Sequence, residues 1–125
     1  MTIKEIAFVA YPVTDVPRAR AFYETVLGLK PASVFEKDGT AFIEYWIGQN
    51  NEHCIVLGAG APMFQPGKTG ATAALEVENF EAAEQRINER QVKIVMPRYD
   101  TPVCSMMMIE DPDGNQIMIH RRKQA

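Results

Sequence analysis

Long apolar segments, cysteine-rich motifs and an excess of basic residues are all missing from this 125-residue sequence. No apolar run approaches the ~20 residues that a membrane-spanning helix needs, so we expect no association with membranes. The two cysteines, Cys54 and Cys104, are too few for a zinc ribbon, and their wide spacing favours reduced thiols over a disulfide. Thirteen basic and sixteen acidic residues give a net charge of −3, which opposes a phosphate backbone, so nucleic acid is not an expected partner.

The N-terminus also lacks the pattern of a signal peptide. Its first residues, Met1 to Glu5, include one lysine but then an acidic residue, and no long apolar segment follows. We therefore expect a cytoplasmic protein. Hydrophobic residues make up 46% and charged residues 23% of the chain, which is typical of a soluble globular domain.

An internal repeat organises the chain. Residues 8–16 align with residues 72–80, so that Val13 matches Val77 and Asp15 matches Asn79. Asp and Asn are strong helix N-caps, because their side-chain oxygens accept hydrogen bonds from the free amides of the first turn. Each segment therefore predicts a strand that runs into a helix.

Helices and hairpins follow each of these strands. Helical spacing predicts one helix from Pro17 to about Val26, ended by Gly28, and another from about Glu81 to Arg90. Strands 34–36 and 41–47 flank an Asp-Gly turn, and strands 103–109 and 116–121 flank an Asp-Pro-Asp-Gly turn. In this alignment Ile47 matches Ile109, Ile55 matches Ile117 and Leu57 matches Ile119.

Each half thus reads strand, helix, strand, strand, strand, which predicts an α+β fold. We expect a single domain over residues 1–125, with module one at about 1–58, a Gly- and Pro-rich connector at 59–69 and module two at about 70–121. A half of about sixty residues buries too little surface to be stable alone. The halves should share a sheet or exchange with a second subunit, so we expect a homodimer.

Alternation along the strands sorts side chains onto two faces. The more uniformly apolar face is expected to be core: Ala7, Val9, Tyr11, Val13, Ile43, Tyr45, Ile47, Ile55, Leu57, Ala71, Ala73, Leu75, Val77, Met107, Ile109, Ile117 and Ile119. The opposite face is mixed: Ile6, Phe8, Ala10, Phe42, Glu44, Trp46, Cys54, Val56, Thr72, Ala74, Glu76, Cys104, Met106, Met108, Gln116, Met118 and His120. If the sheets curve toward one another, this mixed face lines a small-molecule cavity. A sheet that faces solvent or a dimer partner would show the same pattern.

Two motifs carry a family resemblance. Residues 13–29, Val-Thr-Asp-Val-Pro-Arg-Ala-Arg-Ala-Phe-Tyr-Glu-Thr-Val-Leu-Gly-Leu, together with residues 110–115, Glu-Asp-Pro-Asp-Gly-Asn, resemble the vicinal oxygen chelate superfamily. That superfamily includes glyoxalase I, bleomycin-resistance proteins and extradiol dioxygenases. The resemblance covers essentially the whole chain. It implies two βαβββ modules that form a cupped eight-stranded mixed sheet, commonly in a homodimer.

The resemblance also implies where a metal would bind. The metal enzymes of the superfamily place a ligand in the first and last strand of each module, and those positions carry Phe8, Val56, Thr72 and Met118 in this chain. A divalent ion needs carboxylate or imidazole donors, which these residues do not supply. We therefore expect the metal site to be lost and no cofactor to be used.

Candidates for chemistry remain on the mixed face. Glu44 among apolar neighbours would have a raised pKa, which suits a general acid or base, and His120 is a second candidate for catalysis. Glu44 could instead be an exposed carboxylate at the sheet rim, and His120 a partly solvated residue at a strand end. Together with Glu76, the two could also form an improvised metal site.

The remaining residues predict a ligand-binding surface. The candidate ligand-binding residues are Phe8, Phe42, Trp46, Val56, Thr72, Met106, Met108 and Met118. Aromatic rings offer flat surfaces for stacking, and methionine adapts to irregular apolar ligands, although it also fills cores. The leading hypothesis is binding of a small apolar or aromatic molecule without a metal, similar to bleomycin-resistance proteins. The alternatives are an enzyme (lyase, isomerase or dioxygenase) that uses Glu44, His120 or a non-standard metal site, and an interaction module without a ligand.

Overall fold

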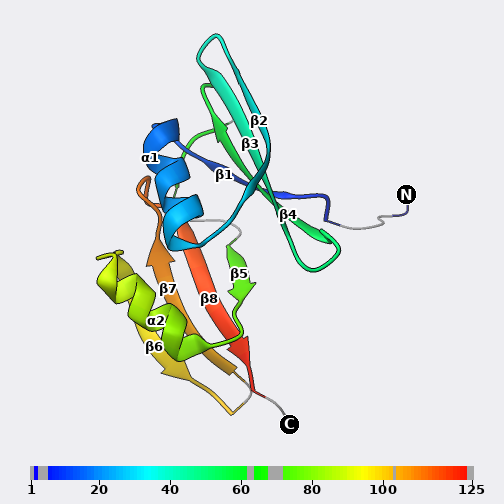
Figure 1. The fold of residues 1–125 in the computed structure, drawn as a ribbon. Coiled ribbons are helices and arrows are strands. Elements are labelled where there is room, and N and C mark those ends of the chain that lie inside the picture. The colour runs from blue at the N-terminus through cyan, green and yellow to red at the C-terminus, as the bar shows by residue number, and fades with distance from the viewer. Residues whose placement is uncertain (1, 3–5, 62–63, 68–71, 103, 124–125) are drawn as a thin grey trace. The chain divides into compact units, whose positions relative to one another are not determined.

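A computed structural model describes residues 2, 6–61, 64–67, 72–102 and 104–123 of the chain. The chain divides into two compact units, residues 1–66 and residues 67–125. Each unit holds a four-stranded mixed sheet and a helical segment after its first strand (Figure 1). In the residues that the structure describes, no helix has the length and apolar character needed to cross a membrane.

The first unit follows the predicted strand and helix order. Its elements are β1 (Val9–Pro12), α1 (Val16–Ala21), the π-helical segment η1 (Phe22–Val26), β2 (Pro31–Lys37), β3 (Thr40–Ile47) and β4 (His53–Ala59). The strands lie in the order β1-β4-β3-β2, with β1 parallel to β4 and the other neighbours antiparallel. The short first strand therefore pairs with the last one.

The second unit repeats this topology. Its elements are β5 (Ala73–Glu76), α2 (Phe80–Glu89), β6 (Ile94–Asp100), β7 (Cys104–Glu110) and β8 (Gln116–Arg122). The order is β5-β8-β7-β6, again with the first strand parallel to the last. The repeat and the βαβββ reading of each half are confirmed; Val103, the predicted start of one strand, lies outside the described residues.

Both helices begin at the predicted caps. The side chain of Asp15 accepts a hydrogen bond from the Arg18 amide at 3.0 Å, and Asn79 accepts one from the Ala82 amide at 3.0 Å. After η1 the chain leaves the helix through Gly28, whose φ of +71° is a conformation that favours glycine. The sequence thus predicts the starts and ends of the helical segments within a residue or so, because local capping determines them.

The two hairpins differ in register, which corrects one match made from sequence. Ile55 pairs with Tyr45 in the first unit, whereas Ile117 pairs with Ile109 in the second. The counterpart of Ile109 is therefore Tyr45, and the match of Ile109 with Ile47 is wrong. The β3–β4 hairpin continues for one more residue pair than β7–β8 beyond these positions, which a fixed spacing along the sequence does not reveal.

One face of each sheet packs against its own helix. On this side the buried residues of the first unit are Tyr11, Val13, Ala19, Phe22, Tyr23, Ala41, Ile43, Tyr45, Ile55, Leu57 and Ala59; those of the second are Phe80, Ile87, Met107, Ile109, Ile117 and Ile119. Apart from Ala41 and Ala59, these strand residues are among those that the alternation assigns to the core, whereas Val9, Ile47, Ala73, Leu75 and Val77 are only half-buried. Cys54, Val56 and Cys104, which the alternation assigns to the mixed face, are also buried. Ala7, also assigned to the core, is exposed because it precedes β1, and Ala71 lies outside the described residues.

A buried tyrosine fastens the first helical segment to its sheet. Tyr45 has no solvent exposure, stacks on Tyr23 and donates its hydroxyl proton to Oε2 of Glu24 at 2.9 Å. Arg20 donates to the same oxygen at 2.7 Å, which lowers the pKa of Glu24. Burial raises the pKa of Tyr45, and the Glu24 carboxylate raises it further, so the hydroxyl stays a proton donor.

Replacing Tyr45 by Phe removes this anchor. We expect Tyr45→Phe to lower the free energy of unfolding by about 1–2 kcal/mol at neutral pH, because a buried hydrogen bond to a charged group is lost. Folding lowers the pKa of Glu24 below its ordinary value of 4.5. The stabilisation from the Glu24 carboxylate is therefore fully present above pH 4.5 and is lost as the pH falls through the pKa of Glu24 in the folded protein. Urea unfolding followed by circular dichroism should therefore show a difference that shrinks in acid.

Tyr99→Phe provides the matched control, since the Tyr99 side chain is 59% exposed. This change should alter stability by less than about 0.5 kcal/mol. Equal effects of the two substitutions, or a Tyr45→Phe effect that is independent of pH, would contradict the anchoring role.

Candidate functional site

The sheet face opposite each helix carries the residues that the sequence predicts for a site. We call this the open face of each unit. On the first it comprises Ala10, Phe35, Phe42, Glu44, Trp46, Cys54, Val56 and Gly58; on the second, Ala74, Glu76, Met96, Tyr99, Cys104, Met106, Met108, Met118 and His120. Because cross-strand partners share a face, the pairing register establishes these two sets.

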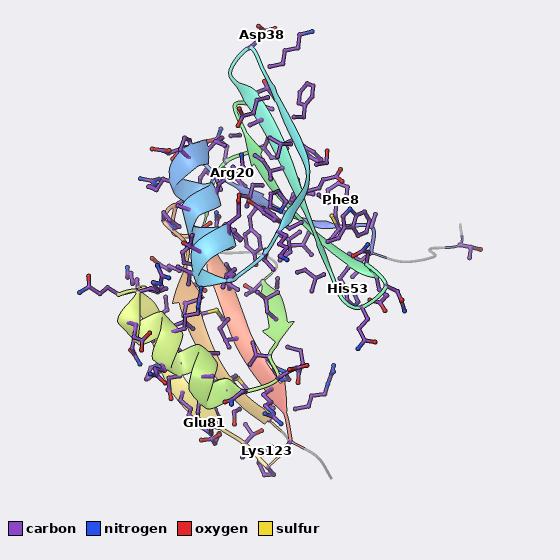
Figure 2. The ribbon with its side chains drawn as sticks, in the orientation of Figure 1. Phe8, Arg20, Asp38, His53, Glu81 and Lys123 are labelled. Carbon is purple, nitrogen blue, oxygen red and sulfur yellow. The ribbon has the colours of Figure 1, made fainter. Side chains whose placement is uncertain are left out.

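Aromatic rings gather on the open face of the first unit. Phe8, which precedes β1, makes an edge-to-face contact with Phe42 at 6.1 Å between ring centroids, and Phe42 lies 6.5 Å from Phe64. Phe8 remains 48% exposed and Trp46, further along β3, 41% exposed. In Figure 2, Phe8 and the α1 residue Arg20 lie on opposite sides of the strands. These rings form an apolar cluster on the side of the sheet away from the helix.

Phe64 belongs to this cluster although the sequence does not predict it. It lies in the connector, which has no strand or helix periodicity from which its direction could be read. The signal that could have found it is Gly58, an otherwise unexplained glycine inside β4. A Cβ atom added at Gly58 would lie 2.5 Å from the Phe64 ring, so the absence of a side chain there lets the ring pack on the sheet.

Glu44 lies beside the aromatic cluster and is half-buried. It occupies β3 opposite Val56, which has no solvent exposure. Burial raises the pKa of the neighbouring Cys54 thiol, and the charge of Glu44 raises it further. A protonated thiol is a poor nucleophile, so this cysteine does not support thiol catalysis. Cys54 and Cys104 are both free, as the sequence predicts, and both are buried.

Methionines cover much of the open face of the second unit. Met108 pairs with Met118 on β8, and Met106 pairs with His120, so these four side chains form a block on adjacent strands. All four are half-buried. The predicted grouping of Met106, Met108 and Met118 on one face is therefore present in the structure.

Two further members of this face come from β6. Met96 pairs with Met108, and Tyr99 pairs with Met106. Alternation along the sequence does not predict them, because β6 shifts register between Ile94 and Met96 and again before Tyr99.

A hydrogen-bonded contact between side chains joins the parallel strands of the second unit. Oε1 of Glu76 lies 2.6 Å from Nδ1 of His120, and Oε2 of Glu76 accepts a hydrogen bond from the Arg122 amide at 2.6 Å. Partial burial alone would raise the pKa of Glu76, but the Arg122 amide and His120 outweigh it, and the pKa is lowered. Glu76 is therefore a carboxylate that holds one imidazole nitrogen and leaves Nε2 available for other contacts.

Two surface hollows have a lining of charged and small side chains. One of about 420 Å³ is lined by Glu76, Val77, Glu78, Arg121 and Arg122, and one of about 470 Å³ is lined by Val16, Pro17, Arg20, Ala21, Glu24, Thr25 and Glu36. Neither contains an aromatic or methionine side chain. We therefore locate the candidate site by the exposed side chains of the open faces, and not by the depth of these hollows.

The four positions of the expected metal site do not offer a suitable donor set. Phe8 is an exposed ring, Val56 is fully buried, Thr72 is exposed and Met118 is half-buried. None supplies the imidazole nitrogen or carboxylate oxygen that a borderline or hard divalent ion prefers. Within the described part of the chain, no group of three or more His, Cys, Asp or Glu side chains is placed to hold a metal ion.

A family model and a curated relative both place this chain in one superfamily. Residues 5–119 match the model of the Glyoxalase/Bleomycin resistance protein/Dioxygenase superfamily. A lactoylglutathione lyase of Salmonella typhimurium is 30% identical over 124 residues, covering 90% of this chain and 89% of the relative.

Solved structures share the fold. TnmS3, an antibiotic binding protein from a Streptomyces species, has a TM-score of 0.81 at 24% identity and covers 98% of this chain and 99% of its own. A superfamily member from Sphaerobacter thermophilus has a TM-score of 0.74 at 22% identity and covers 95% and 98%. At these identities the likeness shows the fold alone.

The contact between Gly58 and Phe64 can be tested by a double-mutant cycle. We expect Gly58→Ala to lower the free energy of unfolding by about 1–3 kcal/mol, because the new methyl group displaces the Phe64 ring. In a Phe64→Ala background the same change should be neutral or stabilising by up to about 1 kcal/mol, since glycine is unfavourable within a strand. Urea unfolding of the four proteins measures both effects.

Gly67→Ala is the matched control, because nothing lies within 4 Å of a Cβ atom added at Gly67. It should change stability little in either background. If Gly58→Ala costs the same with and without Phe64, the ring does not pack on this glycine.

Proposed function

Because the chain belongs to the glyoxalase/bleomycin resistance protein/dioxygenase superfamily, we propose that it binds a small apolar or aromatic organic molecule without the divalent metal of the superfamily's enzymes. The observation that carries this proposal is the aromatic cluster of Phe8, Phe42 and Phe64, with Trp46 exposed on the same open face. The proposed ligand-binding residues are Phe8, Phe42, Trp46, Val56, Thr72, Met106, Met108 and Met118.

Exposed aromatic surface provides the affinity in this proposal. Covering apolar area releases about 25 cal/mol per Å², and a fully buried phenylalanine contributes about 1.5–3 kcal/mol. Phe8 and Trp46 are each more than 40% exposed, so a bound ring system would remove substantial apolar area from water. Stacking against aromatic side chains adds a preference for planar ligands.

The methionines suit the same kind of ligand. Their unbranched side chains adapt to irregular apolar shapes, so they would accept different ring substituents. TnmS3, which has the same fold, is an antibiotic binding protein, and this supports the binding of a small organic molecule by this chain. Assembly as a homodimer and a cytoplasmic location stay predictions from the sequence.

An enzyme is the second candidate, favoured by one observation. The Glu76 carboxylate holds Nδ1 of His120 at 2.6 Å, and an oriented imidazole is suited to general acid–base chemistry. The identity with a lactoylglutathione lyase is in keeping with a lyase. This candidate needs His120 or Glu44 to transfer protons without the usual metal, whereas the binding proposal needs neither.

Trp46 provides the readout for the binding proposal, since it is the only tryptophan and lies on the open face. We expect chelator-treated protein to show saturable quenching of Trp46 fluorescence by members of a panel of planar aromatic compounds and aromatic antibiotics. Phe8→Ala should weaken this binding by about tenfold or more, because a buried phenylalanine is worth about 1.5–3 kcal/mol and 1.4 kcal/mol is a factor of ten.

Val34→Ala is the control for this substitution. Val34 is 47% exposed, nearly the same as Phe8, but it pairs with Ile43 on the helix side of the sheet. Its replacement should leave the affinity unchanged. No saturable quenching across the panel, or equal losses from Phe8→Ala and Val34→Ala, would count against an aromatic ligand on this face.

A further inference from the structure

Soft metal donors are concentrated on the open face of the second unit. β7 presents Cys104, Met106 and Met108 on this face, two residues apart, and β8 presents Met118 and His120. Thioether sulfur and imidazole nitrogen are ligands of soft cations, and thioethers in particular select copper(I) among the biological metals. This chemistry differs from that of the carboxylate and imidazole site that the superfamily's metal enzymes use.

The register places four of these donors next to one another. Met106 lies opposite His120, and Met108 lies opposite Met118 one step along the same face. The Cβ atoms of residues directly opposite each other lie about 4.5–5.5 Å apart, within reach of convergent long side chains. All four side chains are half-buried, so a bound ion would be partly shielded from water.

Glu76 orients the imidazole of this block. It contacts Nδ1 of His120 at 2.6 Å, and its second oxygen is held by the Arg122 amide at 2.6 Å. A carboxylate that fixes one ring nitrogen is the usual partner of a metal-binding histidine, because it fixes the tautomer and increases the basicity of the other nitrogen. His120 therefore presents Nε2 as the nitrogen available to a metal.

The charge of the block favours a monovalent ion. Its three thioethers are neutral, and the Glu76 carboxylate already contacts Nδ1 of His120. A hard divalent ion prefers several anionic oxygen ligands, which this face does not provide. A soft monovalent cation needs less charge compensation and matches sulfur ligands.

We propose that the open face of the second unit binds a soft monovalent metal ion of the copper(I) class through Met106, Met108, Met118 and Nε2 of His120. Glu76 is a positioning residue in this site. The proposal does not depend on the binding of an aromatic molecule, although it shares the methionines with that ligand surface. The two are distinguished by their readouts, since Trp46 lies on the sheet of the first unit.

Silver(I) is a redox-inert probe for this site. It would be titrated into the full-length protein labelled with carbon-13 at the methionine ε-methyl groups. We expect the methyl signals of Met106, Met108 and Met118 to shift together and to saturate at a single ion per chain, while that of Met107 stays in place. Met107 is the internal control, because it is buried on the opposite face of the same strand.

Substitutions test the ligands individually. Met106→Leu and Met108→Leu conserve volume and should each weaken silver binding by about tenfold or more, whereas Met107→Leu should have no effect. His120→Gln should weaken it comparably. Glu76→Gln should cause a loss of about tenfold, because Nδ1 loses the carboxylate that orients the ring.

The cysteines are the main competing ligands for silver and require their own variants. Binding that survives in a Cys54→Ala, Cys104→Ala chain and still shifts the three methyl signals would support the proposal. Unmoved methionine signals, binding that disappears with the cysteines, or an equal loss from Met107→Leu and Met106→Leu would each overturn it.

Discussion

The packing of a helix against one face of a four-stranded sheet determines which residues of each unit are free to form a site. Tyr45 in the first unit and Ile117 in the second have no solvent exposure and lie on the helix side of their sheets. Because side chains alternate along a strand, the residues directly before and after each of them face the opposite side. The stability of each unit and the chemistry of its open face therefore depend on different sets of residues in the same strands.

This separation explains how the fold could keep its architecture while its site changes. The positions of the expected metal site, which carry Phe8, Val56, Thr72 and Met118 in this chain, do not belong to the helix-packed core, so a change of residue there would leave that core intact. Phe8 lies in an aromatic cluster with Phe42 and Phe64, and Met118 lies in a methionine block. Gly58 gives space to the Phe64 ring on the same face as this aromatic cluster.

Features governed by local physics could be predicted from the sequence, whereas those that depend on register between distant segments could not. The caps at Asp15 and Asn79, the Asp-Gly turn and the two-face alternation follow from neighbouring residues. The contact between Glu76 and His120 joins strands 44 positions apart and requires the register of β5 on β8. The positions of Met96 and Tyr99 depend on register shifts in β6, and that of Phe64 on an aperiodic connector.

The proposed function requires that the chain lacks the divalent metal site of the superfamily's enzymes. Metal content measured by plasma mass spectrometry, before and after incubation with nickel, zinc, manganese and ferrous ions followed by dialysis, tests this claim most directly. We expect all four ions to be retained far below one per chain. Near-stoichiometric retention of any of them would contradict the account, indicate displaced ligands such as Glu44, Glu76 or His120, and favour a metal-dependent enzyme.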